Sequence, residues 1–498
     1  MFDAINTAGV DAATLNVCSI LRQGSLDLES YRDASVGILA LKFLCDIQEP
    51  NDVQLEDGVD AVVSSPLRHL ELPTTCDFHA LLNSIDVPGI GDRLDAAFHA
   101  LAKANSMYLD GIQRLHFTST RLGEAKERDR TLGRLIYAIG RDPALDFRQA
   151  DASAFATAAY ACEALLSTMA GALGKRGVEF FTPSAISQLM AELVEPRDGE
   201  SIMDPCCGIG GTLIAGSQRA RQTGNDTGCE LYGQEINGET LALARLNMVL
   251  HNENRTHLAW GDVLQDPKFT APNNKLRTFD VVLSSPPYNL AGWQRESWNA
   301  DPLGRFWRGM PPATSANYAF ISHMVESMSP SHGRMAVVMP MGALFRGGAE
   351  AQIRRKLLEE NLFDAVITLP AKLMPSTTIQ VAVLVLRRQK QDDKVLFIDG
   401  SNFFEYGKTQ NTLGQADLQR IVQAYQQRQQ DTAYSRLVSL REIANNEFNL
   451  NVGHYIQVQA QEEQVDLEAL RAERLMLQAQ LSELEMRLTM LRQDTAYG

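Results

Sequence analysis

Between residues 201 and 398 the sequence alternates between short apolar runs and longer segments in which apolar residues recur at helical spacing. The runs are rich in Val, Ile and Leu, as is typical of strands buried on both faces. They cover residues 201–203, 231–235, 256–260, 279–285, 335–339, 365–369, 381–386 and 395–398. Helical patterns separate several of them, at residues 211–222, 239–250, 318–328 and 349–361. This alternation predicts an α/β fold with a doubly wound parallel sheet, because parallel strands need crossover connections.

Helical patterns also flank the alternating region. Residues 1–150 show apolar residues at helical spacing and no alternating strand pattern, which predicts an N-terminal helical domain. The predicted α/β domain covers residues 151–410, and residues 411–498 are Gln-rich and predicted to be helical. The end of the chain carries a heptad seam of leucines, which we expect to bind a helical partner or a second copy of the chain. Its members are Leu467, Leu470, Leu477, Leu481, Leu484, Leu488 and Leu491.

Composition limits the compartment and the partners to be expected. A chain of 498 residues is too long for one core, so two or three domains are expected. The seven cysteines show no paired metal-binding spacing, which favours a reduced, cytoplasmic protein without a structural metal. No apolar run is long enough to span a membrane. The formal net charge of −15 argues against a protein that coats nucleic acid unaided, but it allows a partner to supply basic surface.

Three acidic residues follow three successive predicted strands. Glu235 ends the second strand, and Asp262 follows the third. Because the carboxyl ends of parallel strands meet at one edge of a sheet, we expect the three carboxylates to line one pocket. The first acid opens a glycine-rich turn, whose sequence is Asp204-Pro205-Cys206-Cys207-Gly208-Ile209-Gly210-Gly211-Thr212.

The chemistry of these acids favours one class of ligand. A P-loop is excluded, since no Gly-Lys-Ser/Thr follows the turn. A dinucleotide would place its pyrophosphate against Asp204, which is electrostatically poor, whereas a cationic or zwitterionic group suits that carboxylate. Glu235 can bind both ribose hydroxyls, and Asp262 can accept a hydrogen bond from an adenine amine. Together the three acids predict a pocket for S-adenosylmethionine.

The fourth strand ends in the turn Ser284-Ser285-Pro286-Pro287-Tyr288-Asn289. The two prolines stop the strand, because neither has an N–H to give to a neighbouring strand. An enzyme that methylates an exocyclic amine needs hydrogen-bond acceptors aimed at the NH₂ group. The hydroxyl of Ser285 and the carbonyl of Pro286, fixed by Pro287, meet that need, and the ring of Tyr288 can stack on an extruded base. Alone, the motif also fits an ordinary Pro-Pro turn.

In their order along the chain, these motifs resemble the gamma-class amino-methyltransferases of DNA, and specifically the modification subunit of type I restriction–modification systems. Phe181-Thr182-Pro183 comes first, then the glycine-rich turn, then the Pro-Pro turn. The likeness extends to Tyr232-Gly233-Gln234-Glu235-Ile236-Asn237 and to Gly333-Arg334-Met335-Ala336-Val337-Val338-Met339-Pro340. Leu41-Lys42-Phe43-Leu44 is similar to a segment of the family's N-terminal domain, so the resemblance covers most of the chain.

The resemblance implies a Rossmann-like methyltransferase sheet whose product is N6-methyladenine in double-stranded DNA. It implies a separate specificity subunit, bound through the C-terminal helices, with two modification subunits for each specificity subunit and a restriction subunit that joins for cleavage. The implied catalytic residues are Ser285, Pro286, Pro287 and Tyr288. The implied ligands of S-adenosyl-L-methionine are Phe181, Thr182, Pro183, Asp204, Gly208, Gly210, Gly211, Thr212, Glu235 and Asp262.

Two positions depart from the family pattern. Ser285 stands where the family usually has Asn, and Tyr288 where it usually has Phe. Because Ser is more typical of cytosine-N4 enzymes, methylation of cytosine N4 is the alternative with the same chemistry. A module that binds S-adenosylmethionine and a partner but has little activity is the alternative of another class.

The loop after the Pro-Pro turn, residues 290–313, mixes tryptophans with arginines. This composition fits a lid that contacts DNA and the extruded base, and it equally fits side chains that pack the loop onto its own domain. The residues concerned are Trp293, Arg295, Trp298, Arg305, Trp307 and Arg308.

Overall fold

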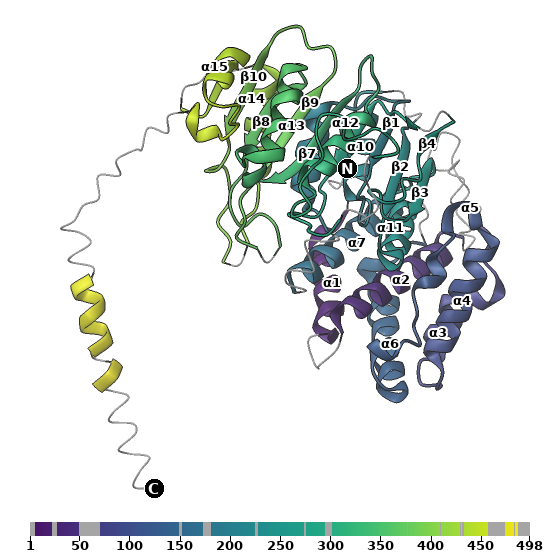
Figure 1. Ribbon diagram of the computed structural model, residues 1–498. Coiled ribbons are helices and arrows are strands. Elements are labelled where there is room, and N and C mark those ends of the chain that lie inside the picture. The colour runs from purple at the N-terminus through teal and green to yellow at the C-terminus, as the bar shows by residue number, and fades with distance from the viewer. Residues whose placement is uncertain are drawn as a thin grey trace. The chain divides into compact units, whose positions relative to one another are not determined.

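The chain forms two units, residues 1–456 and residues 457–498 (Figure 1). The computed structural model describes residues 5–21, 27–48, 70–148, 152–172, 181–224, 228–272, 275–293, 301–375, 377–408, 410–428, 430, 433–456, 474–482 and 484–486. The domain limits predicted near residues 150 and 410 stay predictions.

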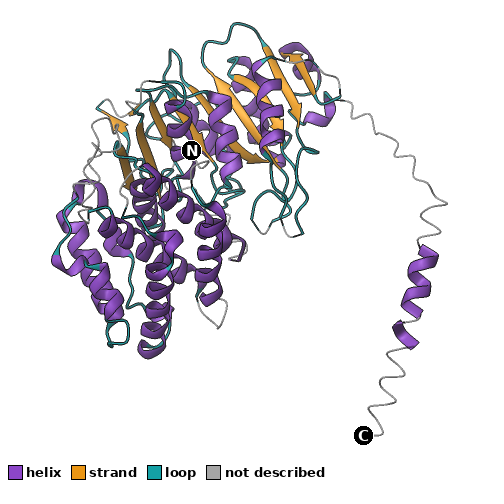
Figure 2. Cartoon of the chain, turned by 180° about the vertical axis from the view of Figure 1, so that it is seen from behind, coloured by secondary structure: helices purple, strands orange, loops and turns teal. Residues whose placement is uncertain are grey.

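Nine strands of the described residues form the central sheet of the first unit, in the order β11-β10-β8-β9-β7-β6-β1-β2-β3. Figure 2 shows the strands of this unit together with the helices that pack on them. The α/β fold predicted from the alternation is confirmed. Two strand directions differ from the parallel expectation, because β9 runs antiparallel to β7 and β8, and β11 runs antiparallel to β10. The strands are β1 (Ser201–Asp204), β2 (Glu230–Glu235), β3 (Thr256–Trp260), β6 (Val281–Ser284), β7 (Arg334–Pro340), β8 (Phe363–Thr368), β9 (Val381–Arg387), β10 (Lys394–Asp399) and β11 (Ser435–Ser439).

Helices cover both faces of the sheet, which explains why the central strands are apolar throughout. On one face lie α9 (Ser184–Val194), α10 (Gly211–Arg221), α11 (Gly238–Leu250) and α14 (Gln415–Gln426). On the other face lie α12 (Asn317–Glu326), α13 (Gly348–Glu359) and α15 (Leu440–Asn445). Smaller elements are β4 (Thr270–Ala271), which pairs with β5 (Lys275–Leu276), and the 3₁₀ turns η6 (Met341–Leu344) and η7 (Val452–His454).

The N-terminal part is helical, as predicted, and its described residues up to 172 contain no strand. Its core continues into the sheet domain through α11. That helix buries Leu243, Leu246 and Leu250 among the N-terminal helices and Leu241 and Met248 towards the sheet. The elements are α1 (Thr7–Leu21), α2 (Leu28–Asp46), η2 (Thr74–Cys76), α3 (Phe78–Asn83), α4 (Ile90–Ala104), α5 (Ser106–Leu109), η3 (Ile112–Arg114), η4 (Thr120–Leu122), α6 (Ala125–Arg141), η5 (Pro143–Leu145) and α7 (Ala152–Ala172).

The stretch after residue 410, predicted to be helical, contains the edge strand β11 as well as α14 and α15, so the all-helical expectation is wrong there. In the second unit, residues 474–482 and 484–486 are helical. Leu477, Leu481 and Leu484 of the heptad seam are exposed. The other four leucines of the seam lie outside the described residues. No described helix has both the length and the apolar character needed to cross a membrane.

A buried arginine at the start of β7 closes the end of α9. Arg334 donates hydrogen bonds to the carbonyls of Val194 and Glu195, the last residue of α9 and the one that follows it. Its Nη1 and Nη2 atoms also lie 3.0 and 2.7 Å from the carboxylate oxygens of Glu200. The same guanidinium thus satisfies carbonyls that an α-helix leaves without internal partners.

We expect Arg334→Ala to lower the free energy of unfolding by ~3 kcal/mol, because carbonyls and a carboxylate lose their partner in a mostly buried site. Urea denaturation followed by circular dichroism measures this loss. The matched control is Arg355→Ala, whose ion pair with Glu359 is exposed on α13 and should cost less than ~1 kcal/mol. Equal losses in the two variants would contradict the capping role.

Candidate functional site

Asp204 is the most buried acid of the predicted site, with 1% of its surface exposed. Its Oδ1 atom accepts hydrogen bonds from the hydroxyl of Ser284 (2.7 Å) and the amide of Cys206 (2.9 Å), and its Oδ2 atom accepts from the hydroxyl of Thr212. Burial raises the pKa of this carboxyl to about 6, although the three hydrogen bonds act against the shift. Asp204 therefore joins β1, the glycine-rich turn, α10 and the end of β6.

The glycine-rich turn needs glycine at two positions. Gly208 and Gly210 have φ values of +52° and +85°, a left-handed conformation that costs other residues energy. The amide of Gly208 donates to Oε2 of Glu235 (3.0 Å), which ties the turn to the end of β2. Burial and the nearby carboxylates raise the pKa of the Cys206 and Cys207 thiols, so these cysteines pack the turn and do not form thiolates.

Glu235 and Asp262 lie at the same edge of the sheet, after β2 and β3. Oε1 of Glu235 accepts from the amide of Asn237 (2.8 Å), and burial raises the pKa of the Glu235 carboxyl. Oδ1 of Asp262 accepts from the amide of Leu264 (2.9 Å). Because each carboxylate oxygen can accept a further hydrogen bond, both acids retain capacity for hydroxyl or amine donors of a ligand.

The Phe181-Thr182-Pro183 motif leads into α9 next to the glycine-rich turn. The ring of Phe181 is buried in the same apolar cluster as Ile209 of that turn. Phe181 and Thr182 also line one pocket with Ile209 and Gly211. The fold thus brings together two motifs that lie apart in the sequence, but Asp204, Glu235 and Asp262 are not among the residues that line this pocket.

The Pro-Pro turn follows β6, which pairs in parallel with β1. The turn therefore starts, at Ser285, close to the end of β1, where Asp204 lies. The hydroxyls of Ser285 and Tyr288 lie 3.4 Å apart. Burial raises the pKa of Tyr288 to about 12, so its hydroxyl stays protonated and can donate to Ser285. Pro286 is buried and Pro287 is exposed, which anchors one side of the turn and leaves the other open.

Side chains that the sequence did not single out hold the turn in place. Asn289 has a φ of +53°, and its amide donates to Oδ1 of Asn317 (3.0 Å). Oδ1 of Asn289 accepts from Nδ2 of Asn317 (3.2 Å) and from Nη1 of Arg346 (2.7 Å). Ser284 is a second such residue, since its hydroxyl binds Asp204. A positive φ is favoured by Asn, so Asn289 carried a weak sequence signal, whereas Ser284 carried none.

The loop after the turn packs on its own domain over the described residues. Trp293, Arg305 and Arg308 are almost fully buried, and the two arginines form ion pairs with carboxylates. The packing alternative is therefore confirmed for these three side chains. Trp307 is exposed. The other two residues of the predicted lid, Arg295 and Trp298, lie outside the described residues.

Comparison with known proteins decides the family. The family described as N-6 DNA Methylase matches residues 156–464, and the HsdM N-terminal domain matches residues 12–139. The chain belongs to the N-6 DNA methylase family. The resemblance to type I modification subunits seen in the motifs is confirmed by this match.

Two relatives of this chain are type I methylase subunits. The MjaVIII methylase subunit of Methanocaldococcus jannaschii is 34% identical over 62% of this chain and 54% of its own length. The HindI methylase subunit of Haemophilus influenzae is 29% identical over 75% of this chain and 84% of its own length. The chain spans a little more than half the length of the first of these relatives.

A solved structure supports the same fold. The methyltransferase subunit of a type I restriction–modification system from Streptococcus thermophilus has a TM-score of 0.76 to this chain. The two share 27% identity, and the match covers 91% of this chain and 100% of the other. The likeness includes the N-terminal helices as well as the sheet domain.

Substitution of the buried acid tests its electrostatics. The pKa of Asp204 is raised, so the stability contributed by its proton is present at low pH and lost as the pH rises through about 6. We compare the free energy of unfolding of the unmodified chain with that of Asp204→Asn. This difference should shift in favour of the unmodified chain by roughly 1 kcal/mol when the pH falls from 8 to 5, because the variant has no titrating group at position 204. Urea denaturation of both proteins at the two pH values measures this change. A difference independent of pH would contradict the buried, titrating carboxyl.

Proposed function

We propose that this chain is the modification subunit of a type I restriction–modification system. In this role it transfers a methyl group from S-adenosylmethionine to the N6 amino group of adenine in double-stranded DNA. The hydrogen bond from Ser284 to Asp204 (2.7 Å) carries the proposal. This bond joins the strand that precedes the Pro-Pro turn to the acid that organises the glycine-rich turn. Acceptors for an amine and a cofactor pocket therefore share one edge of the sheet.

The donor set of the pocket fits S-adenosylmethionine. Glu235 offers two carboxylate oxygens at the end of β2, suited to a ribose diol, and Asp262 offers an acceptor for the adenine amine. The exposed side chain of Ile236 adds an apolar contact beside them. The buried carboxylate of Asp204 favours a ligand with positive charge, and that charge would in turn lower the raised pKa of the acid.

The Pro-Pro turn supplies the groups that act on the base. S-adenosylmethionine provides an electrophilic methyl group when it is bound. Ser285 Oγ and the carbonyl of Pro286 accept hydrogen bonds from the amino group, which directs the nitrogen lone pair and withdraws the positive charge that develops on it. The 3.4 Å contact between the Tyr288 and Ser285 hydroxyls orients Ser285 as an acceptor towards the base.

We expect Ser285→Ala to lower methylation at least ~100-fold, because one acceptor of the amine is lost, and to leave S-adenosylmethionine affinity unchanged. Co-expression with the cognate specificity subunit, followed by mapping of methylated bases, measures activity, and calorimetry measures affinity. Tyr288→Phe keeps the ring but removes the hydroxyl that orients Ser285, so it should lower methylation less than Ser285→Ala does. Ser285→Asn, which restores the usual amide, should retain activity.

The outcomes of this experiment separate the candidate functions. N6-methyladenine at a bipartite site would support the proposal. Detection of N4-methylcytosine would show that the target base is cytosine and not adenine, in line with the serine at position 285. Measurable binding of S-adenosylmethionine without any methyl mark would favour a binding module. Full activity of Ser285→Ala would remove the hydroxyl from the mechanism.

We also propose that the C-terminal helix binds the specificity subunit. Leu477 and Leu481 lie four residues apart in the helical residues 474–482, and Leu484 follows three residues later in the helical residues 484–486; these three exposed leucines are the leucine row. Each of the three side chains is more than half exposed, as expected for a face that is covered only in an assembly. On the basis of the family resemblance, we also propose two modification subunits for each specificity subunit and a restriction subunit that joins the complex for cleavage.

The double variant Leu481→Glu, Leu484→Glu should abolish co-purification with the specificity subunit, because two charges would be buried in an apolar helix contact. Binding of S-adenosylmethionine by the isolated chain should be unchanged. Ala479→Glu places a charge on the opposite side of the same helix and is the matched control. Retention of the specificity subunit by the double variant would exclude this helix as the contact.

A further inference from the structure

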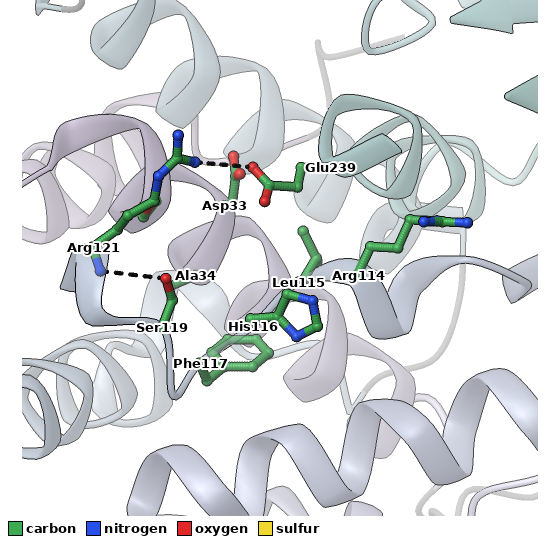
Figure 3. Close-up of a pocket in the computed structure, with 10 residues that line it drawn as sticks. Asp33, Ala34, Arg114, Leu115, His116, Phe117, Ser119, Arg121 and Glu239 are labelled. Atoms are coloured by element: carbon green, nitrogen blue, oxygen red, sulfur yellow. Dashed lines mark hydrogen bonds and ion pairs between the residues drawn. The ribbon is translucent and has the colours of Figure 1, made fainter. Parts of the chain in front are cut away.

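The N-terminal helical layer reaches the cofactor edge of the sheet through a short segment. α5 and η3 pack against α11, the helix that follows Glu235 in the sequence. Figure 3 shows Arg114 and Arg121 from the N-terminal layer beside Glu239 from α11. Arg121 forms an exposed ion pair with Glu239 (3.5 Å), whereas the side chain of Arg114 extends away from that pair.

Arg114 stacks on an aromatic ring of the sheet domain. The central carbon of its guanidinium lies 4.1 Å from the ring centroid of Trp260, the last residue of β3. At this distance a cation and the face of an indole attract each other. Gly238 leaves room for the contact, because a β-carbon at that position would lie 3.0 Å from Cδ of Arg114. Trp260 is 52% exposed with Arg114 in place, and the guanidinium covers one face of its ring.

Trp260 in turn holds the peptide group that orients the ribose-binding acid. Its Nε1 atom donates to the carbonyl of Ile236 (2.9 Å). The N–H of the same peptide group belongs to Asn237 and donates to Oε1 of Glu235 (2.8 Å). One peptide unit is therefore fixed at its oxygen by Trp260 and fixes the Glu235 carboxylate through its N–H.

We propose that Arg114 is a positioning residue for cofactor binding, contributed by the N-terminal helical layer and acting through Trp260 on the Ile236–Asn237 peptide and Glu235. The inference rests on the proposed binding of S-adenosylmethionine at Glu235. A ring held by the guanidinium keeps the peptide in the orientation that presents Glu235 to a ribose, so this order need not be created when the cofactor binds. The proposal gives the N-terminal layer a direct part in cofactor affinity.

The test is calorimetric titration of S-adenosylmethionine into the full chain and its variants. We expect Arg114→Ala to raise Kd about three- to tenfold, the range of one cation–π contact. Arg114→Lys keeps a cation over the ring and should recover part of the affinity. Arg121→Ala is the matched control, because it removes a cation from the same region without touching Trp260, and it should leave Kd unchanged.

A double-mutant cycle and steady-state kinetics add readouts that a loss of stability would not produce. Trp260→Ala should raise Kd as Arg114→Ala does, and the double variant should bind no more weakly than either single variant, because both act on one path. In the assembled enzyme, Arg114→Ala should raise KM for S-adenosylmethionine and leave kcat and KM for DNA unchanged.

The inference is overturned if Arg114→Ala binds with the Kd of the unmodified chain, if Arg121→Ala weakens binding equally, or if the effects of the double variant add. A proportional fall in kcat would also overturn it, since the path described ends at the ribose and not at the amine. Failure of the unmodified chain to bind S-adenosylmethionine would instead overturn the proposed function, and this inference with it.

Discussion

The arrangement of the site depends on one buried carboxylate. Asp204 is almost inaccessible to water, and its two oxygens bind partners from the glycine-rich turn, from α10 and from the end of β6. Removing a charge from water is costly, and the raised pKa of this acid records that cost. Three hydrogen-bond donors converge on the Asp204 carboxylate and offset part of this cost. The same convergence ties the glycine-rich turn to the end of the strand that precedes the Pro-Pro turn.

A second constraint comes from α11, which is apolar on two sides. It buries Leu241 towards the sheet and Leu246 towards the N-terminal helices, so neither layer is complete without it. The helix begins at Gly238, shortly after Glu235 at the end of β2. A shift of the N-terminal layer against α11 is therefore a shift close to Glu235, and the stacking of Arg114 on Trp260 lies at that point.

Much of the fold could be predicted because most of its strands are short apolar runs, and several of these runs are separated by segments with helical spacing of apolar residues. The direction of β9 could not, since a strand buried on both faces shows the same apolar pattern in either direction. β11 was missed because its residues, Ser435 to Ser439, are largely polar and lie at a sheet edge. The strand-end acids were found from their spacing. The roles of Ser284 and Arg114 depend on contacts between segments far apart in the sequence, which no local pattern contains.

The net charge of the chain and the burial of several of its arginines both indicate that another subunit supplies the positively charged surface for DNA in the proposed complex. Arg32, Arg305, Arg308 and Arg354 are among the largest fully buried side chains, and they bind carboxylates and carbonyls inside the protein. These four cations therefore cannot neutralise DNA phosphates from the surface. With a net charge of −15, the chain has little surplus positive charge to replace them. In the proposed complex, affinity for DNA thus depends on basic surface of the specificity subunit, and the exposed leucine row near the C-terminus is the means by which this chain would acquire it.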